Sequence, residues 1–244
     1  MIPFDRLSIV LPSAIDVKGV ANMQRADPLV RLADHERALA RWLDDPHVRN
    51  IIFIENSGYP LDSLRTLVAR HSAGKDVEFL SFDGQDFPRS RGKGYGEALA
   101  MQRLLEHSTQ LRRTGHFLKV NGRYYVPNVA RVLSGMDDDV DVFCNLNRSL
   151  GFSDCRVYGG SLAFLERVVH EGLKVDEETG GWLEHAVARA ALVSISQGLS
   201  WRFITHLARI EGVSGSIDGP YAEPPAKQWV KGRVHALKQA LLRW

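Results

Sequence analysis

Three glycines alternate with two cations in the segment Arg91-Gly92-Lys93-Gly94-Tyr95-Gly96-Glu97, just before a stretch with helical periodicity. Glycine lets a backbone approach a ligand closely, and N–H groups at a helix start attract anions. With Arg91 and Lys93 supplying charge, the segment resembles a phosphate cradle. No Ser or Thr follows a Gly-Lys pair, and the spacing is not G-x-G-x-x-G, so it is neither a P-loop nor a dinucleotide fingerprint. A flexible turn with solvated charges is the alternative interpretation.

A second pair of cations, Lys119 and Arg123, lies where an apolar strand ends in the polar turn Asn121-Gly122. Arginine offers a planar fork for phosphate oxygens and lysine a compact charge. Together they are suited to stabilise a leaving diphosphate without a metal ion. Solvated turn charges are the alternative here as well.

Short apolar runs that alternate with amphipathic segments must position these side chains, and this alternation predicts an α/β fold with a largely parallel sheet. We expect strands over 7–11, 51–54, 77–82 and 117–120, with Pro12 ending the first. Helices are expected over 29–43, from Asp62 onward and over 98–105, with a turn at 92–96. Beyond Val126 the pattern is mixed, with strands over 140–144 and near 156–158 and helices over 162–169 and 182–193.

Polar residues follow each of the first four predicted strands. Ligands of open α/β sheets bind beyond the carboxyl ends of the strands, so these exits should converge on one crevice. The exits are Pro12-Ser13, Glu55-Asn56-Ser57, Ser81-Phe82-Asp83 and Asn121-Gly122-Arg123.

Composition excludes several classes of protein. The 244 residues are 44% hydrophobic and 25% charged with a net charge of +2, which is ordinary for a globular protein and too balanced to favour a nucleic-acid partner. Two cysteines cannot build a disulfide framework, and the first residues lack a signal-peptide pattern. We therefore expect a cytoplasmic protein.

Four blocks of the chain together resemble small glycosyltransferases of bacterial O-antigen and capsule gene clusters, which are GT-A-type enzymes. The blocks are Ile54-Glu55-Asn56-Ser57-Gly58-Tyr59, Val77-Glu78-Phe79-Leu80-Ser81-Phe82, Arg91 to Glu97 and Lys119-Val120-Asn121-Gly122-Arg123-Tyr124. The resemblance extends over about residues 7 to 215. It implies a GT-A-like, Rossmann-like sheet flanked by helices, with a mixed acceptor-side C-terminal half. It also implies transfer of a hexose from a nucleoside-diphosphate sugar to a glycan or lipid-linked glycan of a surface polysaccharide.

The sequence departs from the GT-A pattern at the position of the usual metal site. The strand that usually ends in Asp-x-Asp ends here in Asn121-Gly122-Arg123, so we expect no metal cofactor, with Lys119 or Arg123 doing the electrostatic work. The competing source of ligands for Mg²⁺ or Mn²⁺ is Asp137, Asp138, Asp139 and Asp141, although an acidic turn is more often solvated.

The resemblance also implies a general base and a set of donor contacts. Our candidate base is Glu184, with Asp176, Glu177 and Glu178 as rivals. Asp27 is equally explained as a helix cap. With Lys119 and Arg123 as the other catalytic candidates, the expected nucleotide-sugar contacts are Pro12, Ser13, Arg25, Asp27, Arg31, Asn56, Ser57, Arg91, Lys93, Gly94, Glu97 and Asn121.

We expect one catalytic domain over 1–225, with a nucleotide-sugar half (1–126) and an acceptor half (127–225). Residues 226–244 have an apolar stripe and a lysine face, which predicts an amphipathic helix that either packs on the domain or contacts the inner face of the cytoplasmic membrane. A non-catalytic sugar-nucleotide or glycan-binding partner of a polysaccharide assembly complex is the alternative function. A sugar-1-phosphate nucleotidyltransferase is disfavoured because Leu11-Pro12-Ser13 carries no glycine-rich loop.

Overall fold

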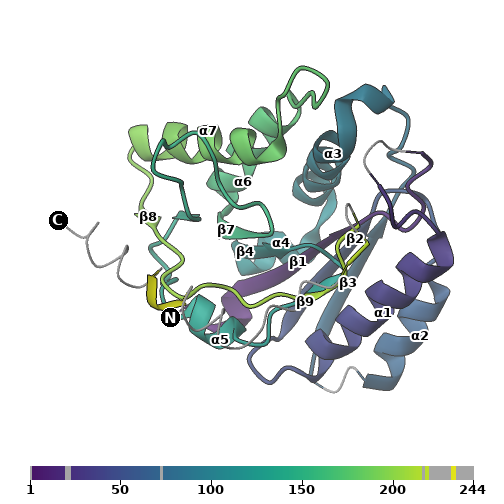
Figure 1. Cartoon of the computed structure of the whole chain (residues 1–244). Coiled ribbons are helices and arrows are strands. Elements are labelled where there is room, and N and C mark those ends of the chain that lie inside the picture. The colour runs from purple at the N-terminus through teal and green to yellow at the C-terminus, as the bar shows by residue number, and fades with distance from the viewer. Residues whose placement is uncertain (1, 20–22, 72–73, 216–217, 220–231, 235–244) are drawn as a thin grey trace.

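The computed structural model describes residues 2–19, 23–71, 74–215, 218–219 and 232–234. A seven-stranded sheet in the order β3-β2-β1-β4-β7-β6-β8 forms the centre, and helices lie against both of its faces (Figure 1). The α/β fold with a mostly parallel sheet, expected from the sequence, is confirmed.

The first half of the chain builds the parallel part of this sheet. Both β2 and β4 pair in parallel with β1, and β3 pairs in parallel with β2. The elements are β1 (Leu7–Ser13), α1 (Pro28–Asp44), β2 (Asn50–Glu55), α2 (Asp62–His71), β3 (Asp76–Ser81), α3 (Gly92–His107), α4 (Thr109–Thr114) and β4 (His116–Val120).

The second half adds antiparallel pairing. Strand β7 runs antiparallel to both β4 and β6, and β5 pairs with β9 in a separate two-stranded sheet. The elements are β5 (Tyr124–Tyr125), α5 (Val129–Leu133), β6 (Val142–Phe143), β7 (Val157–Ser161), α6 (Leu162–Gly172), α7 (Leu183–Ser196), β8 (Trp201–Arg202) and β9 (Glu211–Gly212). The expected strand over 140–144 is therefore shorter than predicted.

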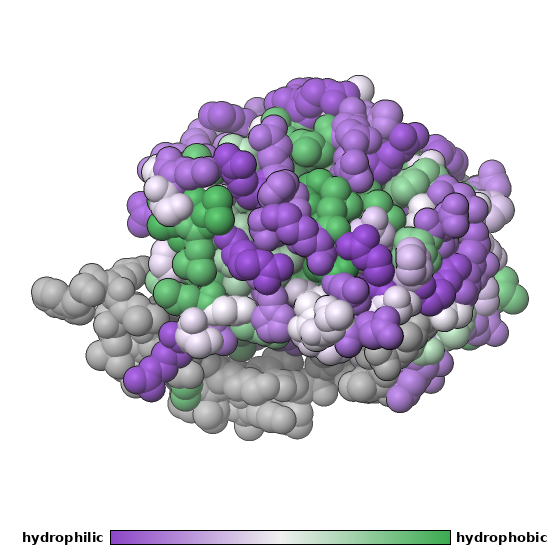
Figure 2. All heavy atoms as spheres, turned by 90° about the horizontal axis from the view of Figure 1, so that it is seen from above, coloured by the Kyte–Doolittle hydropathy of each residue, from purple (hydrophilic) through white to green (hydrophobic). Residues whose placement is uncertain are grey.

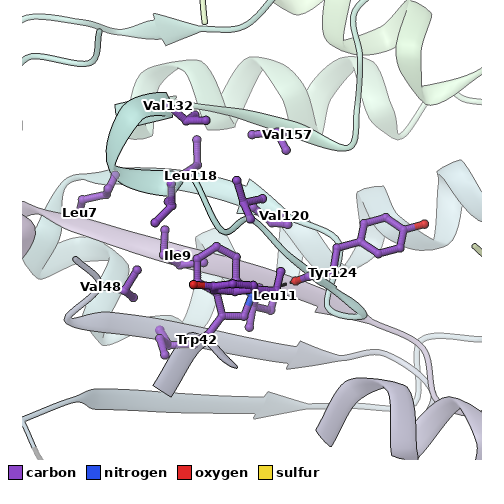
Figure 3. Close-up of a cluster of buried hydrophobic side chains, with 14 of the residues drawn as sticks. Leu7, Ile9, Leu11, Trp42, Val48, Leu118, Val120, Tyr124, Val132 and Val157 are labelled. Carbon is purple, nitrogen blue, oxygen red and sulfur yellow. Dashed lines mark hydrogen bonds between the residues drawn. The ribbon is translucent and has the colours of Figure 1, made fainter. Parts of the chain in front are cut away.

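Alternating side chains of the central strands feed two cores, one on each face. Ile9 and Leu11 of β1 pack with α1, α2 and α5, whereas Val10 packs with α3, α4, α6 and α7, as the two-residue period of a strand requires. In the first core the indole N–H of Trp42 donates to the carbonyl oxygen of Tyr124 at 2.8 Å (Figure 3). Burial of each Val, Leu, Ile, Phe or Met side chain contributes roughly 1.5–3 kcal/mol, so the two cores stabilise the sheet from both faces.

Pro12 does not end β1, as the sequence analysis expected. The strand continues to Ser13, because the Pro12 carbonyl still accepts a hydrogen bond from Gly122 N at 2.9 Å although proline has no N–H to donate.

The glycine-rich segment is also not a turn before the helix, because it forms the first turns of α3. Gly92 has φ of +77°, and a Cβ on Gly94 would lie 3.1 Å from both Glu177 Oε1 and Leu183 Cβ. These glycines thus allow α3 to begin in close contact with the segment before α7.

Most of the predicted C-terminal amphipathic helix over 226–244 lies outside the described residues. Among the residues that the structure does describe, no helix is both long and apolar enough to span a bilayer.

Candidate functional site

A cavity of about 210 Å³ opens beyond the carboxyl ends of β1 and β4. These two strands are neighbours, and the chain leaves β1 toward β2 and β3 on one side but continues past β4 toward β7 on the other. Such a topological switch point is where α/β sheets bind ligands. Polar residues from three of the four predicted exits line the cavity, whereas Ser81 to Asp83 do not, because β3 is at the sheet edge, two strands away from β1.

The structure brings most of the predicted site residues together here. The cavity is lined by Pro12, Ser13, Arg31, Asn56, Lys93, Gly94, Glu97, Lys119, Asn121, Arg123 and Glu184.

Arg31 and Arg123 form a cationic wall. Both are almost completely buried, with 3% and 5% exposure. The Arg31 guanidinium donates to the carbonyls of Ala14, Ile15 and Arg25, and Arg123 donates to the Val213 carbonyl at 3.1 Å. Burial, and then the charge of Arg123, lowers the pKa of Arg31 to about 9. An anion placed between the two guanidinium groups would relieve this repulsion.

Lys119 and Glu97 form an ion pair within the cavity wall. Lys119 Nζ lies 2.5 Å from Glu97 Oε1 and donates to the Cys155 carbonyl at 2.6 Å. Lys119 is only 1% exposed, so a broken pair would leave an uncompensated buried charge. Lys119 therefore has its charge balanced by a carboxylate in the same cavity.

The Glu177 carboxylate occupies the start of α3. Its Oε1 accepts a hydrogen bond from Gly94 N at 2.8 Å, and a Cβ on Gly92 would collide with the same carboxylate. Burial raises the pKa of Glu177, opposed mainly by that hydrogen bond. The predicted phosphate cradle is thus filled by the protein's own anion, which stabilises the helix N-terminus.

The candidate base Glu184 lies in the first turn of α7 and lines the cavity. Its backbone oxygen accepts a hydrogen bond from Ser153 N at 3.1 Å. Among the described residues its carboxylate has no hydrogen-bond or ion-pair partner, in contrast to Glu97 and Glu177. Of the rivals, Glu177 also lines the cavity, and Asp176 and Glu178 do not.

Four predicted nucleotide-sugar contacts lie outside the cavity lining and have other partners. Asp27 caps α1 by accepting from the N–H groups of Leu29 and Val30, as its alternative interpretation expected. Arg25 forms a salt bridge with Asp34, and the backbone N–H of Ser57 donates a hydrogen bond to the Glu55 carboxylate. Arg91 donates to the carbonyls of Val175 and Leu173, which ties α3 to the segment that carries Glu177.

The acidic turn at 137–141 lies at the opposite end of the sheet. It precedes β6, which runs in the direction of β4, and Asp138 pairs at 2.6 Å with Arg6, which precedes β1. Asp141 accepts from Ser200 N at 3.0 Å. Across the described residues, no group of three or more His, Cys, Asp or Glu is arranged to hold a metal ion. These aspartates therefore do not fit a metal that would act in the cavity.

Two buried groups beside the cavity have roles that the sequence analysis did not predict: His35 was not singled out, and Glu55 was expected only as part of a polar strand exit. His35 contacts Ser13 Oγ at 3.3 Å, and burial, followed by the charges of Arg123 and Arg31, holds the pKa of its ring well below 6.5. The Glu55 carboxylate accepts from the backbone N–H groups of Ile15, Ser57 and Tyr59 and so joins the exits of β1 and β2. A histidine on the apolar face of α1 and a polar residue ending a buried strand were the only signals in the sequence.

Further lining residues come from segments that carry no motif. Gln85, Arg156 and Ser214 reach the cavity from three different loops.

No protein-family model matches the chain, and no curated protein matches it either. Among solved structures, it is similar to the glycosyltransferase GlyE of Streptococcus pneumoniae, with 9% identity over 80% of this chain and 44% of that chain and a TM-score of 0.49. It is also similar to the nucleoside-diphosphate-sugar pyrophosphorylase of Vibrio cholerae, with 11% identity over 80% and 90% and a TM-score of 0.45. The bifunctional glycosyltransferase WbbM has 10% identity over 96% and 44%, with a TM-score of 0.48.

The chain spans less than half the length of the GlyE and WbbM chains. At these scores and identities the likenesses do not identify a reaction, which has to be argued from the side chains of the cavity.

Proposed function

We propose that the protein is a nucleotide-sugar-dependent glycosyltransferase whose donor binds in the cavity at the switch point. The observation that carries this proposal is the arrangement of charges. Two buried arginines stand on one side of the cavity, and a half-buried carboxylate without a partner among the described residues stands at the start of α7. Inverting transfer from a sugar nucleotide uses both features: cations stabilise the diphosphate, and a general base takes the proton of the acceptor hydroxyl.

Arg31 and Arg123 are proposed to hold the diphosphate. When the bond between the anomeric carbon and the diphosphate oxygen breaks, negative charge develops on the departing nucleoside diphosphate. Guanidinium groups already fixed by backbone carbonyls, as those of Arg31 and Arg123 are, can stabilise that charge without reorganising. In this account Lys119 acts indirectly, by holding Glu97 in place.

Glu184 is proposed as the general base. It would take the proton of the acceptor hydroxyl while the acceptor oxygen bonds to the anomeric carbon, so that the products are the glycoside and the nucleoside diphosphate. Glu97 and Glu177 are less suited, because each already has a partner inside the protein.

The finer assignment rests on the four sequence blocks described above. Their resemblance to O-antigen and capsule glycosyltransferases supports a hexose as the transferred sugar and a surface polysaccharide as the acceptor. The pocket itself supports only the sugar-nucleotide class of donor.

The test is release of nucleoside diphosphate from a panel of UDP-, GDP-, dTDP-, CDP- and ADP-hexoses, with and without lipid-linked acceptors. We expect turnover with at least one donor, lowered about 10²-fold or more by Glu184→Gln. Glu178→Gln, which changes a nearby glutamate outside the cavity, is the matched control. Binding of a sugar nucleotide without any turnover would instead support the non-catalytic binding partner.

A further inference from the structure

Apolar side chains stand exposed beside the cavity, at the start of α7. Trp182 directly precedes α7 and is 37% exposed, and Phe152 is 41% exposed. The face of the molecule that carries α3 and α7 shows apolar residues reaching the surface among hydrophilic ones (Figure 2). Aromatic side chains, Trp above all, are enriched at binding surfaces because they combine a large apolar face with a polar handle.

The two aromatic residues are joined to each other through His185. The ring of Phe152 meets the ring of His185 edge-on, with centroids 5.9 Å apart, and His185 Nδ1 accepts from Trp182 N at 3.3 Å. We call Phe152, Trp182 and His185 the aromatic rim.

The aromatic rim is continuous with the candidate base. Leu183 and Glu184, which directly follow Trp182, both line the cavity. On the other side, Ser153 follows Phe152 and donates its N–H to the Glu184 carbonyl. A ligand that lies on the rim would therefore place its end near the Glu184 carboxylate.

The loop that carries Phe152 is held in a defined shape. Asn147 N donates to the Phe152 carbonyl at 2.9 Å, and the Asn147 side chain accepts from Phe152 N at 3.2 Å. The aromatic ring is thus presented by an ordered turn, which lowers the entropy cost of binding.

We propose that the aromatic rim is the acceptor subsite and that it binds a sugar ring of a glycan; this rests on the proposed function. A pyranose has an apolar C–H face and a rim of hydroxyl groups, which match an aromatic ring with a carboxylate beside it. Phe152 and Trp182 together expose on the order of 150–200 Å², far less than the roughly 800 Å² per partner of a stable protein interface. The small apolar surface with a carboxylate beside it therefore favours a sugar ring as the occupant.

The experiment measures glycan binding and nucleotide binding separately on the full chain. Wild type, Trp182→Ala, Trp182→Phe and Phe152→Ala are applied to an array of bacterial surface oligosaccharides, and the affinity of each for UDP, GDP, dTDP, CDP and ADP is measured by calorimetry. Leu192→Ala is the matched control, because Leu192 is also 37% exposed on α7 but has no place in the cavity lining. Circular dichroism verifies that each variant is folded.

We expect wild type to retain one or more glycans, and Trp182→Ala and Phe152→Ala to weaken that binding about tenfold or more. Trp182→Phe should restore most of it, Leu192→Ala should bind like wild type, and nucleotide affinity should stay unchanged throughout. Glycan binding that survives both alanine substitutions would overturn the acceptor subsite, as would a wild type that binds a nucleotide but no glycan. A wild type that binds no nucleotide would instead refute the proposed function, whatever the array shows.

Discussion

Lys119 Nζ lies 2.5 Å from Glu97 Oε1, and this pair joins β4 to α3 in the wall of the cavity. The two residues come from the two segments that looked most like phosphate sites in the sequence. In the structure the positive charge of Lys119 and the negative charge of Glu97 neutralise each other. Arg31 and Arg123, whose guanidinium groups donate to backbone carbonyls, therefore carry much of the cationic character of the cavity.

The Lys119–Glu97 pair should behave as one unit in stability measurements. Lys119→Met leaves the Glu97 carboxylate without its cation, and we expect it to lower the free energy of unfolding by about 2–4 kcal/mol. Glu97→Gln leaves Lys119 unpaired, and the double variant should be less destabilised than the sum of the two single variants. Urea unfolding of all four proteins measures this coupling, and strictly additive effects would mean that the pair contributes nothing.

His35 should make stability fall in mild acid. Its pKa is lowered in the folded protein, so the neutral ring is favoured there. The stability that this contributes is fully present above the unfolded value of about 6.5 and is lost as the pH falls through the folded value. Between pH 7.5 and 5, wild type should therefore lose more thermal stability than His35→Gln does. Exposed His71→Gln is the control and should follow wild type, whereas parallel curves for wild type and His35→Gln would exclude the effect.

Chelation should leave turnover unchanged. The strand exit Asn121-Gly122-Arg123 brings a cation and no carboxylate to the cavity, and the aspartates of the 137–141 turn lie at the other end of the sheet. Release of nucleoside diphosphate is measured before and after dialysis against EDTA. Complete loss that Mn²⁺ restores would contradict this prediction and would assign a catalytic role to a bound metal ion.

The sheet could be predicted from the sequence because its information is local. The runs around Ile9, Ile52 and Leu118 are apolar, strand-length and separated by amphipathic segments, which suffices to predict parallel crossovers. The predictions for Pro12 (a strand end) and for the glycines at 92–96 (a turn) were wrong, because they rested on the intrinsic preferences of proline and glycine. Contacts with residues distant in the sequence determine the conformation of both segments. At its position in β1, Pro12 takes part in hydrogen bonding through its carbonyl oxygen, so its missing N–H does not end the strand. Gly94 is closely packed against Leu183.

The sequence predicts where the candidate site lies in the fold, but it does not predict which residues of the site contact each other. Residues at the exits of β1, β2 and β4 meet because parallel strands end on one edge. The contact of Gly94 with Glu177 spans 83 positions of the chain, and that of Arg91 with Val175 spans 84. No local pattern encodes such pairs, so the anion that fills the start of α3 could not be foreseen.

The most direct test of the account is calorimetric titration of the full chain with UDP, GDP, dTDP, CDP and ADP, comparing wild type with Arg123→Gln. Arg37→Gln is the control, because Arg37 lies on α1 with an exposed side chain and outside the cavity lining. The account predicts that wild type and Arg37→Gln bind at least one of these diphosphates alike, and that folded Arg123→Gln binds it about tenfold or more weakly. Equal affinity of Arg123→Gln and wild type, or no binding of any diphosphate by wild type, would contradict it.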